Sequence, residues 1–489
     1  MTTSRDEAEH ARLNHLHPPN WCNPTPEARY DFVILGGGTA GLRAAHAAAA
    51  LGVKVALVER HLLGGNCLNI GCVPSKALIR TSRLYAEMRD AEQFGAQSPA
   101  DIQVDFAAVM QRMRDIRARL SRTSSVHELA AAGVHVFFGD AQFIGSDVLQ
   151  LDGATLRFRK ALIATGAHPD MPSIDGLDAA GYFTNASVFD LISLPQRLLV
   201  IGGGPLGCEM AQAFCRFGAR TTIVQNWPLF LPREERDAAQ LLSDAFARDG
   251  IEVRLNTEVV SVRVEDGQKL VHLVSDGYHS TVAVDAILTG TGRIPTVNDF
   301  GLDAAGVAFD GDHGVHVNDF LRTSNRRIYA AGDVCLEHKF NDMADATARM
   351  AVHNALRRGR QRLSDLTIPW CTYTDPEVAH VGMYVRQARE RDIPVKTFTI
   401  PMHDVDRAVA DSEEAGFVKI HVREGSDRIL GATIVARHAG EMIGELTLAM
   451  VAGVGLRTLS RVMHPYPTQA QAITLAADAC RRASRERSQ

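Results

Sequence analysis

Apolar strands, glycine-rich turns and apolar helical stretches follow one another in the same order twice along the chain. The first series has a β-rich apolar run at residues 29–35, a glycine turn at 36–41, an alanine-rich stretch at 42–51 and a second apolar run at 53–58. Short apolar strands that alternate with a helix predict a βαβ unit with parallel strands. The second series places strand, turn, helix and strand at residues 197–201, at 202–207, up to 217, and at 219–224.

Both glycine turns have the spacing of a dinucleotide-binding loop. In such loops glycines let the backbone approach a pyrophosphate, the helix N-terminus supplies positive potential, and an acid after the second strand holds a ribose. Glu59 is that acid in the first unit, 23 residues after the first glycine, and Gln225 has the same offset in the second. The glycines are Gly36, Gly38 and Gly41, then Gly202, Gly204 and Gly207. Two units predict two dinucleotides, and FAD with NAD(P)H is the economical pair for one electron-transfer site.

Three further apolar strands end in glycine or in an acid. Those that lead into Thr165-Gly166 and into Gly292-Arg293 are interpreted as chain crossings between domains. Asp333 follows a strand and lies where ligands of parallel sheets bind, and it is also compatible with a helix N-cap. From about residue 368 the pattern changes to alternating runs and then to apolar helical periodicity over 441–454, which predicts a separate α+β domain.

The predicted fold class is therefore α/β, with two Rossmann-like dinucleotide-binding domains and a C-terminal α+β domain, about three domains for 489 residues. Residues 1–28 alternate charges, histidines and prolines, which predicts an extended N-terminal arm. The expected limits are 29–166 with 285–362 for the FAD-binding domain, 167–284 for the NAD(P)-binding domain, and 363–489 for the C-terminal domain.

Composition narrows the class of partner. The chain is 46% hydrophobic and 22% charged, with a formal net charge of -5, so no large basic field attracts nucleic acid and a small-molecule partner is expected. No apolar run reaches the ~20 residues of a membrane span or resembles a signal-peptide core, which predicts a cytoplasmic protein. Its eight cysteines are not expected to form a structural disulfide framework.

The segment 64–76, Gly-Gly-Asn-Cys-Leu-Asn-Ile-Gly-Cys-Val-Pro-Ser-Lys, follows the first dinucleotide unit directly. Its cysteines, Cys67 and Cys72, open a helix beside the expected flavin site, and a helix N-terminus lowers the pKa of a thiol because it favours the thiolate. The alternative, two unrelated core cysteines, does not account for this position. The pair is predicted to be redox-active.

These segments resemble class I pyridine nucleotide-disulfide oxidoreductases, the family of glutathione reductase, dihydrolipoamide dehydrogenase and mercuric reductase. The resemblance implies that Cys72 is the flavin-proximal thiolate, that Cys67 is the interchange thiol that meets the substrate, and that Lys76 and Glu209 form an ion pair beside flavin N5. It extends over residues 29–480 and includes both glycine turns, the cysteine segment, Thr-Gly-Arg at 291–293, Ala-Ala-Gly-Asp at 330–333 and Tyr-Thr-Asp-Pro-Glu at 373–377.

The resemblance also implies cofactor contacts, with Glu59 on the adenosine ribose of FAD and Asp333 on its ribityl chain. Candidate FAD-binding residues are Gly36, Gly38, Gly41, Glu59, Gly65, Thr165, Gly166 and Asp333. Candidate NAD(P)-binding residues are Gly202, Gly204, Gly207, Gln225, Gly292 and Arg293. No resident metal site is predicted. The C-terminal domain would form a homodimer in which the C-terminal segment of each subunit lies over the cysteines of the other.

The C-terminal segment departs from the disulfide-reducing members, in which His-x-His-Pro-Thr-x-x-Glu supplies a proton shuttle. Tyr466 takes the place of the base and Gln471 that of its carboxylate partner. A phenol with a reference pKa near ~10 stays protonated at neutral pH and an amide does not titrate, so reduction of ordinary disulfides should lose roughly 10²- to 10⁴-fold. His464 lies two positions away, and Tyr466 has an alternative role as a packed interface aromatic.

Mercuric reductases also have tyrosine at this position and transfer electrons to a thiolate-bound soft metal ion, which needs no base for a departing thiol. The C-terminal segment has only Cys480 where these enzymes have a Cys-Cys pair, and no N-terminal metal-binding domain is expected. The first hypothesis is a reductase of this type that acts on a metal ion or on another acceptor that needs no His-Glu dyad. The alternatives are a disulfide reductase or dihydrolipoamide-dehydrogenase-like enzyme with an unusual substrate, and a slow-turnover flavin redox sensor.

Gln225 also bears on the choice of nicotinamide cofactor. An acid at this position would hold the ribose of NADH and repel a 2′-phosphate, so its absence favours NADPH over NADH. No arginine follows directly, and either Arg220 or Arg233 would have to supply the positive charge.

Overall fold

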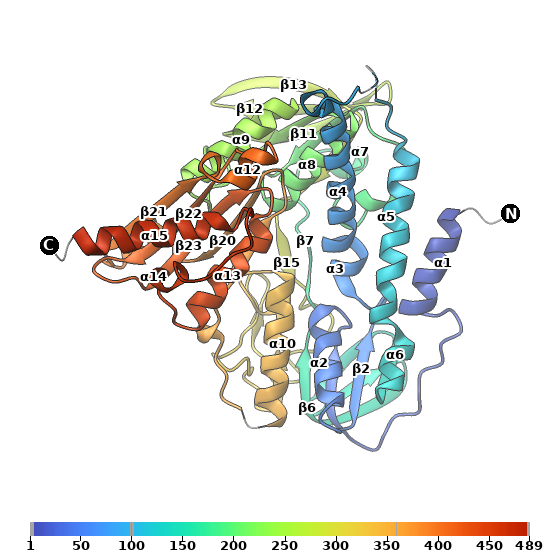
Figure 1. Cartoon of the computed structure of the whole chain (residues 1–489). Helices are drawn as coiled ribbons and strands as arrows, with labels where there is room; N and C mark the ends of the chain where they lie inside the picture. The colour runs from blue at the N-terminus through green and yellow to red at the C-terminus, as the bar shows by residue number, and fades with distance from the viewer. Residues whose placement is uncertain (1–3, 98, 100–101, 358, 487–489) are drawn as a thin grey trace.

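The computed structural model describes residues 4–97, 99, 102–357 and 359–486. Figure 1 shows three parts, each built around a β-sheet, with the C-terminal part at the left and the N-terminal helix at the right. In these residues no helix is both long enough and apolar enough to cross a membrane.

The lower part of Figure 1 contains a seven-stranded sheet. Strands β3, β2, β1, β6 and β18 are parallel neighbours in that order, and β5 and β4 continue from β6 in antiparallel pairing. Their residues are apolar in long runs because both faces of the parallel section are covered, one of them by α2 (Thr39–Ala49) and α10 (Asn341–Leu356). The strands are β1 (Tyr30–Leu35), β2 (Val55–Glu59), β3 (Val134–Phe138), β4 (Ala141–Gly145), β5 (Val148–Leu151), β6 (Ala154–Ile163) and β18 (Ile328–Ala330).

The second part repeats the strand-helix-strand order around a four-stranded parallel sheet in the order β10-β9-β8-β14. Helices α8 (Pro205–Phe217) and α9 (Arg236–Asp249) pack on it, and a three-stranded antiparallel sheet, β11 to β13, adjoins it. The strands are β8 (Arg197–Ile201), β9 (Arg220–Val224), β10 (Glu252–Arg254), β11 (Thr257–Glu265), β12 (Gln268–Ser275), β13 (Tyr278–Val284) and β14 (Ala286–Thr289).

Two short strands connect these parts. β7 (Ala167–Pro169) pairs antiparallel with β15 (Arg293–Pro295), so the outgoing and returning segments of the chain lie side by side. This pairing brings together the two segments that the sequence analysis interpreted as chain crossings.

The C-terminal part is a five-stranded antiparallel sheet in the order β19-β20-β23-β22-β21. Helix α13 (Ala439–Val451) covers β20 and β23, and α15 (Gln471–Glu486) lies on β21 and β22. The strands are β19 (Pro369–Thr372), β20 (Glu377–Gly382), β21 (Val395–Pro401), β22 (Phe417–Arg423) and β23 (Ile429–Ala436). The predicted fold class, two α/β dinucleotide-binding units followed by an α+β domain, is confirmed.

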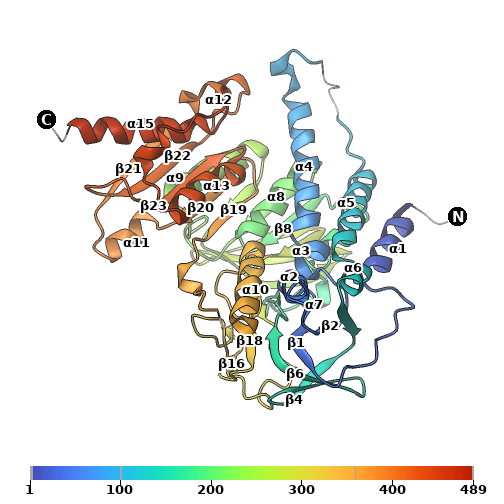
Figure 2. The same ribbon diagram turned by 60° about the horizontal axis from the view of Figure 1, so that its bottom comes forward.

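The N-terminal segment is not the extended arm that we predicted. Helix α1 (Ser4–Leu16) packs along α5 (Phe106–Ser121), as Figures 1 and 2 show. Ala8, Arg12 and Leu16 are buried and are spaced four residues apart, which places them on one face of the helix. The charged and histidine residues between them obscured this short periodicity.

The structure also corrects one predicted domain limit. Residues 286–289 were assigned to the FAD-binding domain, but they form β14, which pairs with β8 in the four-stranded sheet. The reason is that the chain completes this parallel sheet before it returns through β15.

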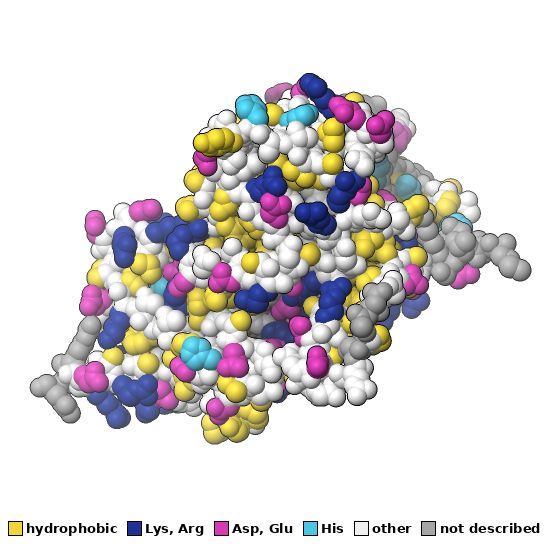
Figure 3. Space-filling view, turned by 90° about the horizontal axis from the view of Figure 1, so that it is seen from above, with side chains coloured by type: hydrophobic (Ala, Val, Ile, Leu, Met, Phe, Trp, Pro, Cys, Tyr) yellow, Lys and Arg dark blue, Asp and Glu magenta, His cyan; other side chains and the backbone are white. Residues whose placement is uncertain are grey.

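Charges are mixed over the surface. In Figure 3 the Lys and Arg side chains of the described residues alternate with Asp and Glu side chains over the face seen from above. This distribution agrees with the absence of a large basic field in the composition.

Candidate active site

The first glycine turn has the conformation that its sequence requires. Gly36 has a φ of +105°, and a Cβ on Gly41 would lie 1.8 Å from the carbonyl oxygen of Gly36. Gly38 is the N-cap of α2, and no side chain caps that helix. The first N–H groups of α2 are therefore available to an anionic ligand.

The second turn reproduces this geometry. Gly202 has a φ of +103°, a Cβ on Gly207 would lie 2.0 Å from the carbonyl oxygen of Gly202, and Gly204 is the uncapped N-cap of α8. In each turn the first and third glycines leave no room for a side chain, so the backbone can approach a pyrophosphate there. The two turns therefore fit the two dinucleotides that the sequence analysis predicts.

Glu59 and Gln225 occupy equivalent positions after the second strand of each unit. Glu59 accepts hydrogen bonds from the backbone N–H of Gly37 at 2.6 Å and of His61 at 2.8 Å. Gln225 is buried and donates from Nε2 to the carbonyl oxygen of Leu229 at 2.8 Å. The second site thus has a neutral amide where the first has a carboxylate.

The cysteine segment lies against the first glycine turn. A Cβ on Gly65 would lie 2.6 Å from the Cα of Gly38, so only glycine permits this approach. Gly65 begins helix α3 (Gly65–Ile70) and Cys72 begins helix α4 (Cys72–Arg89), which packs on α8. The fold thereby brings Cys67 and Cys72 to the predicted flavin-binding turn.

Both thiols of the pair are free, and they differ in acidity. The hydrogen bond from the Cys67 thiol to the Cys72 sulfur lowers the pKa of Cys72 to about 7. Desolvation by neighbouring atoms opposes this, although Cys72 is exposed, and the charge of Lys76 lowers the pKa further. The same hydrogen bond, together with burial, raises the pKa of Cys67. Cys72 is therefore the more acidic thiol of the pair, and Cys67 the less acidic one.

Lys76 and Glu209 form the predicted ion pair across α4 and α8. Lys76 Nζ lies 2.9 Å from Oε2 and 3.0 Å from Oε1 of Glu209, whose side chain is only 4% exposed. The backbone N–H of Tyr373 donates to Glu209 Oε1 at 3.0 Å, and Lys76 Nζ lies 4.4 Å from the centre of the Tyr373 ring. Tyr373 belongs to the motif at residues 373–377, but its contact with Glu209 has no local signal in the sequence.

The crossing segments join residues that were assigned to different cofactors. Arg293 Nη1 lies 2.6 Å from Asp333 Oδ2, and Arg293 also donates to the carbonyl oxygen of Ala167. Asp333 lies inside the short helix η4 (Gly332–Val334), whose N-cap is Ala331, so Asp333 is not a helix N-cap. Burial raises the pKa of Asp333, and Arg293 opposes this.

Thr165 and Gly166 mark the first of these crossings. Thr165 Oγ1 donates to the carbonyl oxygen of Thr296 at 2.7 Å, and the carbonyl of Gly166 accepts from the N–H of Thr296 at 2.9 Å. Gly292, in the second crossing, has a φ of +142°. These contacts hold the two crossings together.

The C-terminal segment places Tyr466 and His464 in different surroundings. Tyr466 is 72% exposed, and its hydroxyl donates to Asp406 Oδ2 at 2.8 Å. His464 lies 2.8 Å from Glu445 Oε2 through Nε2 and 2.8 Å from Thr474 Oγ1 through Nδ1. Both ring nitrogens of His464 are thus engaged, and its partner Glu445, 19 residues away, had no local signal in the sequence.

Within the described part of one chain, no hydrogen bond connects Tyr466 with Cys67 or Cys72. Gln471, which begins α15, keeps its Oε1 buried and without a hydrogen-bond partner among the described residues. The predicted Tyr466–Gln471 replacement of the dyad is therefore not a bonded pair.

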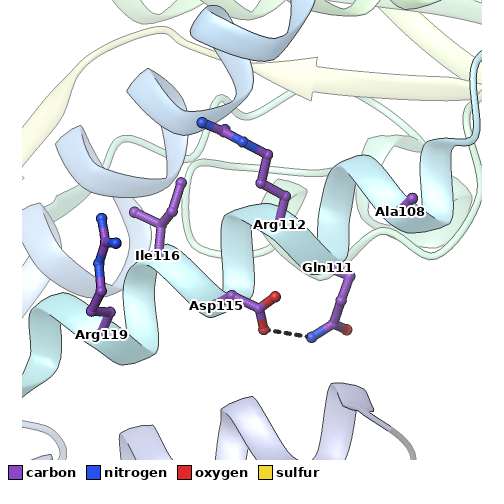
Figure 4. Close-up of a pocket in the computed structure, with 6 residues that line it drawn as sticks. All are labelled: Ala108, Gln111, Arg112, Asp115, Ile116 and Arg119. Carbon is purple, nitrogen blue, oxygen red and sulfur yellow. Dashed lines mark hydrogen bonds between the residues drawn. The ribbon is translucent and has the colours of Figure 1, made fainter.

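A hollow of about 490 Å³ lies along α5, lined by residues of that helix alone (Figure 4). Arg112 donates to the carbonyl oxygen of Ala77 in α4, and Gln111 donates to Asp115. None of the predicted site residues lines this hollow, so it is separate from the candidate active site.

Comparison with known proteins supports this site. The model of the pyridine nucleotide-disulphide oxidoreductase family matches residues 30–359, and the model of its dimerisation domain matches residues 368–477. The predicted resemblance is thereby confirmed, and the dimerisation domain indicates a homodimer.

Individual relatives carry different names. Mercuric reductase from Streptomyces lividans is 35% identical over 455 residues, which cover 92% of this chain and 95% of that protein. Dihydrolipoyl dehydrogenase from Thermus scotoductus is 32% identical over 459 residues, covering 92% and 97%. The copper(II) complex of the HOCl-induced flavoprotein disulfide reductase RclA from Escherichia coli superposes with a TM-score of 0.83 at 28% identity, covering 93% of this chain and 100% of that one.

Proposed function

This chain belongs to the pyridine nucleotide-disulphide oxidoreductase family, and we propose that it passes electrons from NAD(P)H through FAD to Cys67 and Cys72. From this pair the electrons pass to a thiolate-bound soft metal ion or to another acceptor that needs no proton shuttle. The observation that carries this proposal is the position of Cys67 and Cys72 against the first glycine turn and on the helix that holds the Lys76–Glu209 ion pair. A thiolate is the nucleophile in disulfide exchange and the preferred ligand of soft metal ions.

The two glycine turns would hold the cofactors. FAD would lie on the turn at Gly36–Gly41 with its ribose at Glu59, and the nicotinamide dinucleotide on the turn at Gly202–Gly207. When bound, FAD supplies a carrier that accepts a hydride and releases two electrons to a disulfide. Among the crossing residues, the Arg293–Asp333 pair supports an assignment of both to the flavin side, although Arg293 was predicted on the nicotinamide side.

The cysteines would then act with distinct roles. Cys72 is the more acidic thiol, because the hydrogen bond from Cys67 and the charge of Lys76 both favour its thiolate. When the dithiol delivers two electrons to the acceptor, Cys67 releases its proton and a disulfide bond forms between the two sulfurs. Glu209 orients Lys76 throughout, because its own carboxylate is fixed by the N–H of Tyr373.

The absence of a proton shuttle at Tyr466 supports an acceptor that releases no basic thiol. Tyr466 donates its proton to Asp406, which stabilises the neutral phenol, and this hydrogen bond raises the pKa of Tyr466. His464 has no free ring nitrogen while Glu445 and Thr474 bind it. A metal ion bound by thiolates needs no such base. One relative is named a mercuric reductase. A similar solved structure, named a flavoprotein disulfide reductase, is a copper(II) complex.

NADPH is the proposed nicotinamide cofactor, since Gln225 carries no charge that would repel a 2′-phosphate. Arg220 begins β9, a five-residue strand that spans roughly 13 Å, so it lies at the wrong end to contact the ribose. Arg233 is exposed and lies beyond the C-terminal end of that strand, which makes it the candidate for the phosphate contact.

The remaining predictions concern assembly and location. We propose an obligate homodimer with two shared active sites, in which the segment around Tyr466 reaches the cysteines of the partner subunit. The domain limits, apart from the transfer of β14 to the second unit, and the cytoplasmic location also remain predictions.

The test is an acceptor panel of Hg²⁺, Cu²⁺, quinones, small disulfides and lipoyl disulfides, with NADPH oxidation as the readout. We expect turnover with at least one metal ion, lost in Cys67→Ala and retained in Cys22→Ala. Turnover confined to disulfides would instead favour a disulfide reductase, and fast single reduction with slow turnover on every acceptor would favour a redox sensor. Full activity of Cys67→Ala and Cys72→Ala on every acceptor would exclude the cysteine route.

A further inference from the structure

The loop between the two cysteines is organised by one buried amide. Asn69 is 7% exposed and lies in α3 between Cys67 and Cys72. Its Nδ2 donates to the carbonyl oxygens of Leu63 and Gly65, each at 3.0 Å. The side chain thus ties the end of α3 back to the residues before Cys67.

Two buried arginines bind the same residue. Arg12 of α1 donates from Nη1 to Asn69 Oδ1 at 2.5 Å, and Arg117 of α5 donates from Nη1 to the carbonyl oxygen of Asn69 at 2.9 Å. Arg12 is 8% exposed and Arg117 is 4% exposed. Both guanidinium groups are thereby paired with oxygen acceptors, and loss of a partner from a buried charge is strongly destabilising.

Glu9 completes the cluster. Arg12 Nε donates to Glu9 Oε2 at 3.0 Å, and Arg117 Nη2 lies 3.5 Å from the same oxygen. One carboxylate therefore orients both arginines toward Asn69. The N–H groups of the Arg12 guanidinium thus donate both to Glu9 in its own helix and to Asn69 between the two cysteines.

Helix α1 is held in place by contacts besides those of Arg12, so it can keep Arg12 in position against Asn69. Leu16 is fully buried, the N–H of Leu63 donates to the carbonyl oxygen of Leu16 at 3.4 Å, and His15 Nδ1 lies 2.8 Å from Ser121 Oγ of α5. Figures 1 and 2 both show α1 beside α5 and on the side of the molecule away from the C-terminal sheet. The family model begins only at residue 30, so this helix lies outside the matched segment.

We propose that Arg12 is a positioning residue for the redox pair: by holding Asn69 it fixes the separation of Cys67 and Cys72, and so stabilises the disulfide relative to the dithiol. This rests on the proposed redox role of the pair. A disulfide requires the two Cβ atoms to lie about 3.8 Å apart, and a loop held near that geometry raises the effective concentration of one thiol at the other. A loosened loop would shift the equilibrium toward the dithiol.

The experiment measures the equilibrium between the protein disulfide and dithiol in buffers of oxidised and reduced dithiothreitol. Purified FAD-loaded protein is quenched with acid and alkylated, and the Cys67 and Cys72 peptides are quantified by mass spectrometry. Each exchange converts one dithiothreitol from dithiol to disulfide as the protein disulfide becomes a dithiol.

For Arg12→Met we expect the equilibrium constant for disulfide formation to fall about 10-fold, which raises the reduction potential by about 30 mV. Arg12→Lys keeps the charge but lacks the fork that reaches both Glu9 and Asn69, so it should show most of the same loss. Glu9→Gln, a milder change, should shift the constant in the same direction by a smaller factor. Arg119→Ala removes an exposed arginine of α5 and should leave the constant unchanged.

Hydrogen exchange of residues 67–72 supplies a second readout, expected to accelerate in Arg12→Met and not in Arg119→Ala. If exchange accelerates while the equilibrium constant stays within twofold of the unaltered protein in both Arg12→Met and Glu9→Gln, Arg12 is merely structural and the proposal is overturned. A recovered constant in Arg12→Lys would also overturn it, because charge alone would then suffice. If the unaltered protein forms no Cys67–Cys72 disulfide in any buffer, the proposed function fails instead.

Discussion

Removal of the Cys67 thiol should make Cys72 a much weaker acid. The hydrogen bond from Cys67 is the largest influence on the Cys72 thiolate, whose pKa lies at about 7. A hydrogen bond to a charged acceptor contributes about 1.5–3 kcal/mol net, and one pKa unit corresponds to about 1.4 kcal/mol. Cys67→Ala should therefore raise the pKa of Cys72 to between about 8 and 9.

The sign of the pH dependence follows from this value. The Cys72 thiolate is lost as the pH falls through about 7, so in the unaltered protein about half of it is present at pH 7. In Cys67→Ala the thiolate fraction at pH 7 should drop to roughly 1–10%. Lys76→Met should also raise the pKa of Cys72, and Glu209→Gln should lower it, because the lysine charge favours the thiolate and the carboxylate disfavours it.

The assay is a pH titration of thiolate ultraviolet absorbance in the fully reduced protein, taken as the difference from Cys72→Ser. Cys22→Ala, which removes an exposed cysteine in the N-terminal segment, is the control and should leave the midpoint at about pH 7. A midpoint that stays there in Cys67→Ala would refute the reasoning, since the hydrogen bond could then not be the main cause. Shifts of this midpoint in opposite directions in Lys76→Met and Glu209→Gln would show that these two charges also influence the pKa of Cys72, in addition to the hydrogen bond.

Three further predictions concern the cofactors and the ion pair. Gly41→Ala should abolish FAD retention, whereas Gly207→Ala should keep FAD and lose NADPH binding in calorimetry, because each added Cβ meets a turn carbonyl at about 2 Å or less. Gln225→Glu should lower the affinity for NADPH relative to NADH by about 10-fold (about 1.4 kcal/mol), measured from the two dissociation constants. Lys76→Met should destabilise the protein by about 2–3 kcal/mol in urea unfolding, a value reduced because Lys76 is partly exposed. A second substitution, Glu209→Gln, should recover most of this loss because it removes the unpaired buried charge. A ratio of the two dissociation constants that is unchanged in Gln225→Glu, or additive losses in the double variant, would contradict the corresponding argument.

Residue types at short spacing allowed much of this structure to be predicted. The glycines of both turns were identified from their spacing, and the requirement is local: Gly36 and Gly202 adopt a positive φ, and a Cβ on Gly41 or Gly207 would meet the carbonyl oxygen of the glycine five residues before it. The Cys67–Cys72 pair was identified for the same reason, since one short helix and the start of the next hold both cysteines. Lys76 and Glu209, 133 residues apart, were paired only by resemblance to the family.

Some predictions failed where a local pattern was overruled by a distant partner. Residues 286–289 were assigned by chain order, whereas their strand is placed by its hydrogen bonds to β8. The N-terminal segment was assigned by composition, whereas its helix is stabilised by a buried contact face against α5. His464 could not be evaluated at all without Glu445.

The sequence by itself determined the two dinucleotide units, the cysteine pair and the family, because turns, helix starts and strand periods depend on neighbouring residues. Only the tertiary structure decided which side chains meet across these elements. The contact of Arg12 with Asn69 spans 57 residues and that of Arg293 with Asp333 joins separate segments of the chain. Such pairs follow no regular spacing in the sequence. The packing of helices and sheets, rather than the distance along the chain, decides which buried polar and charged groups come within hydrogen-bond distance.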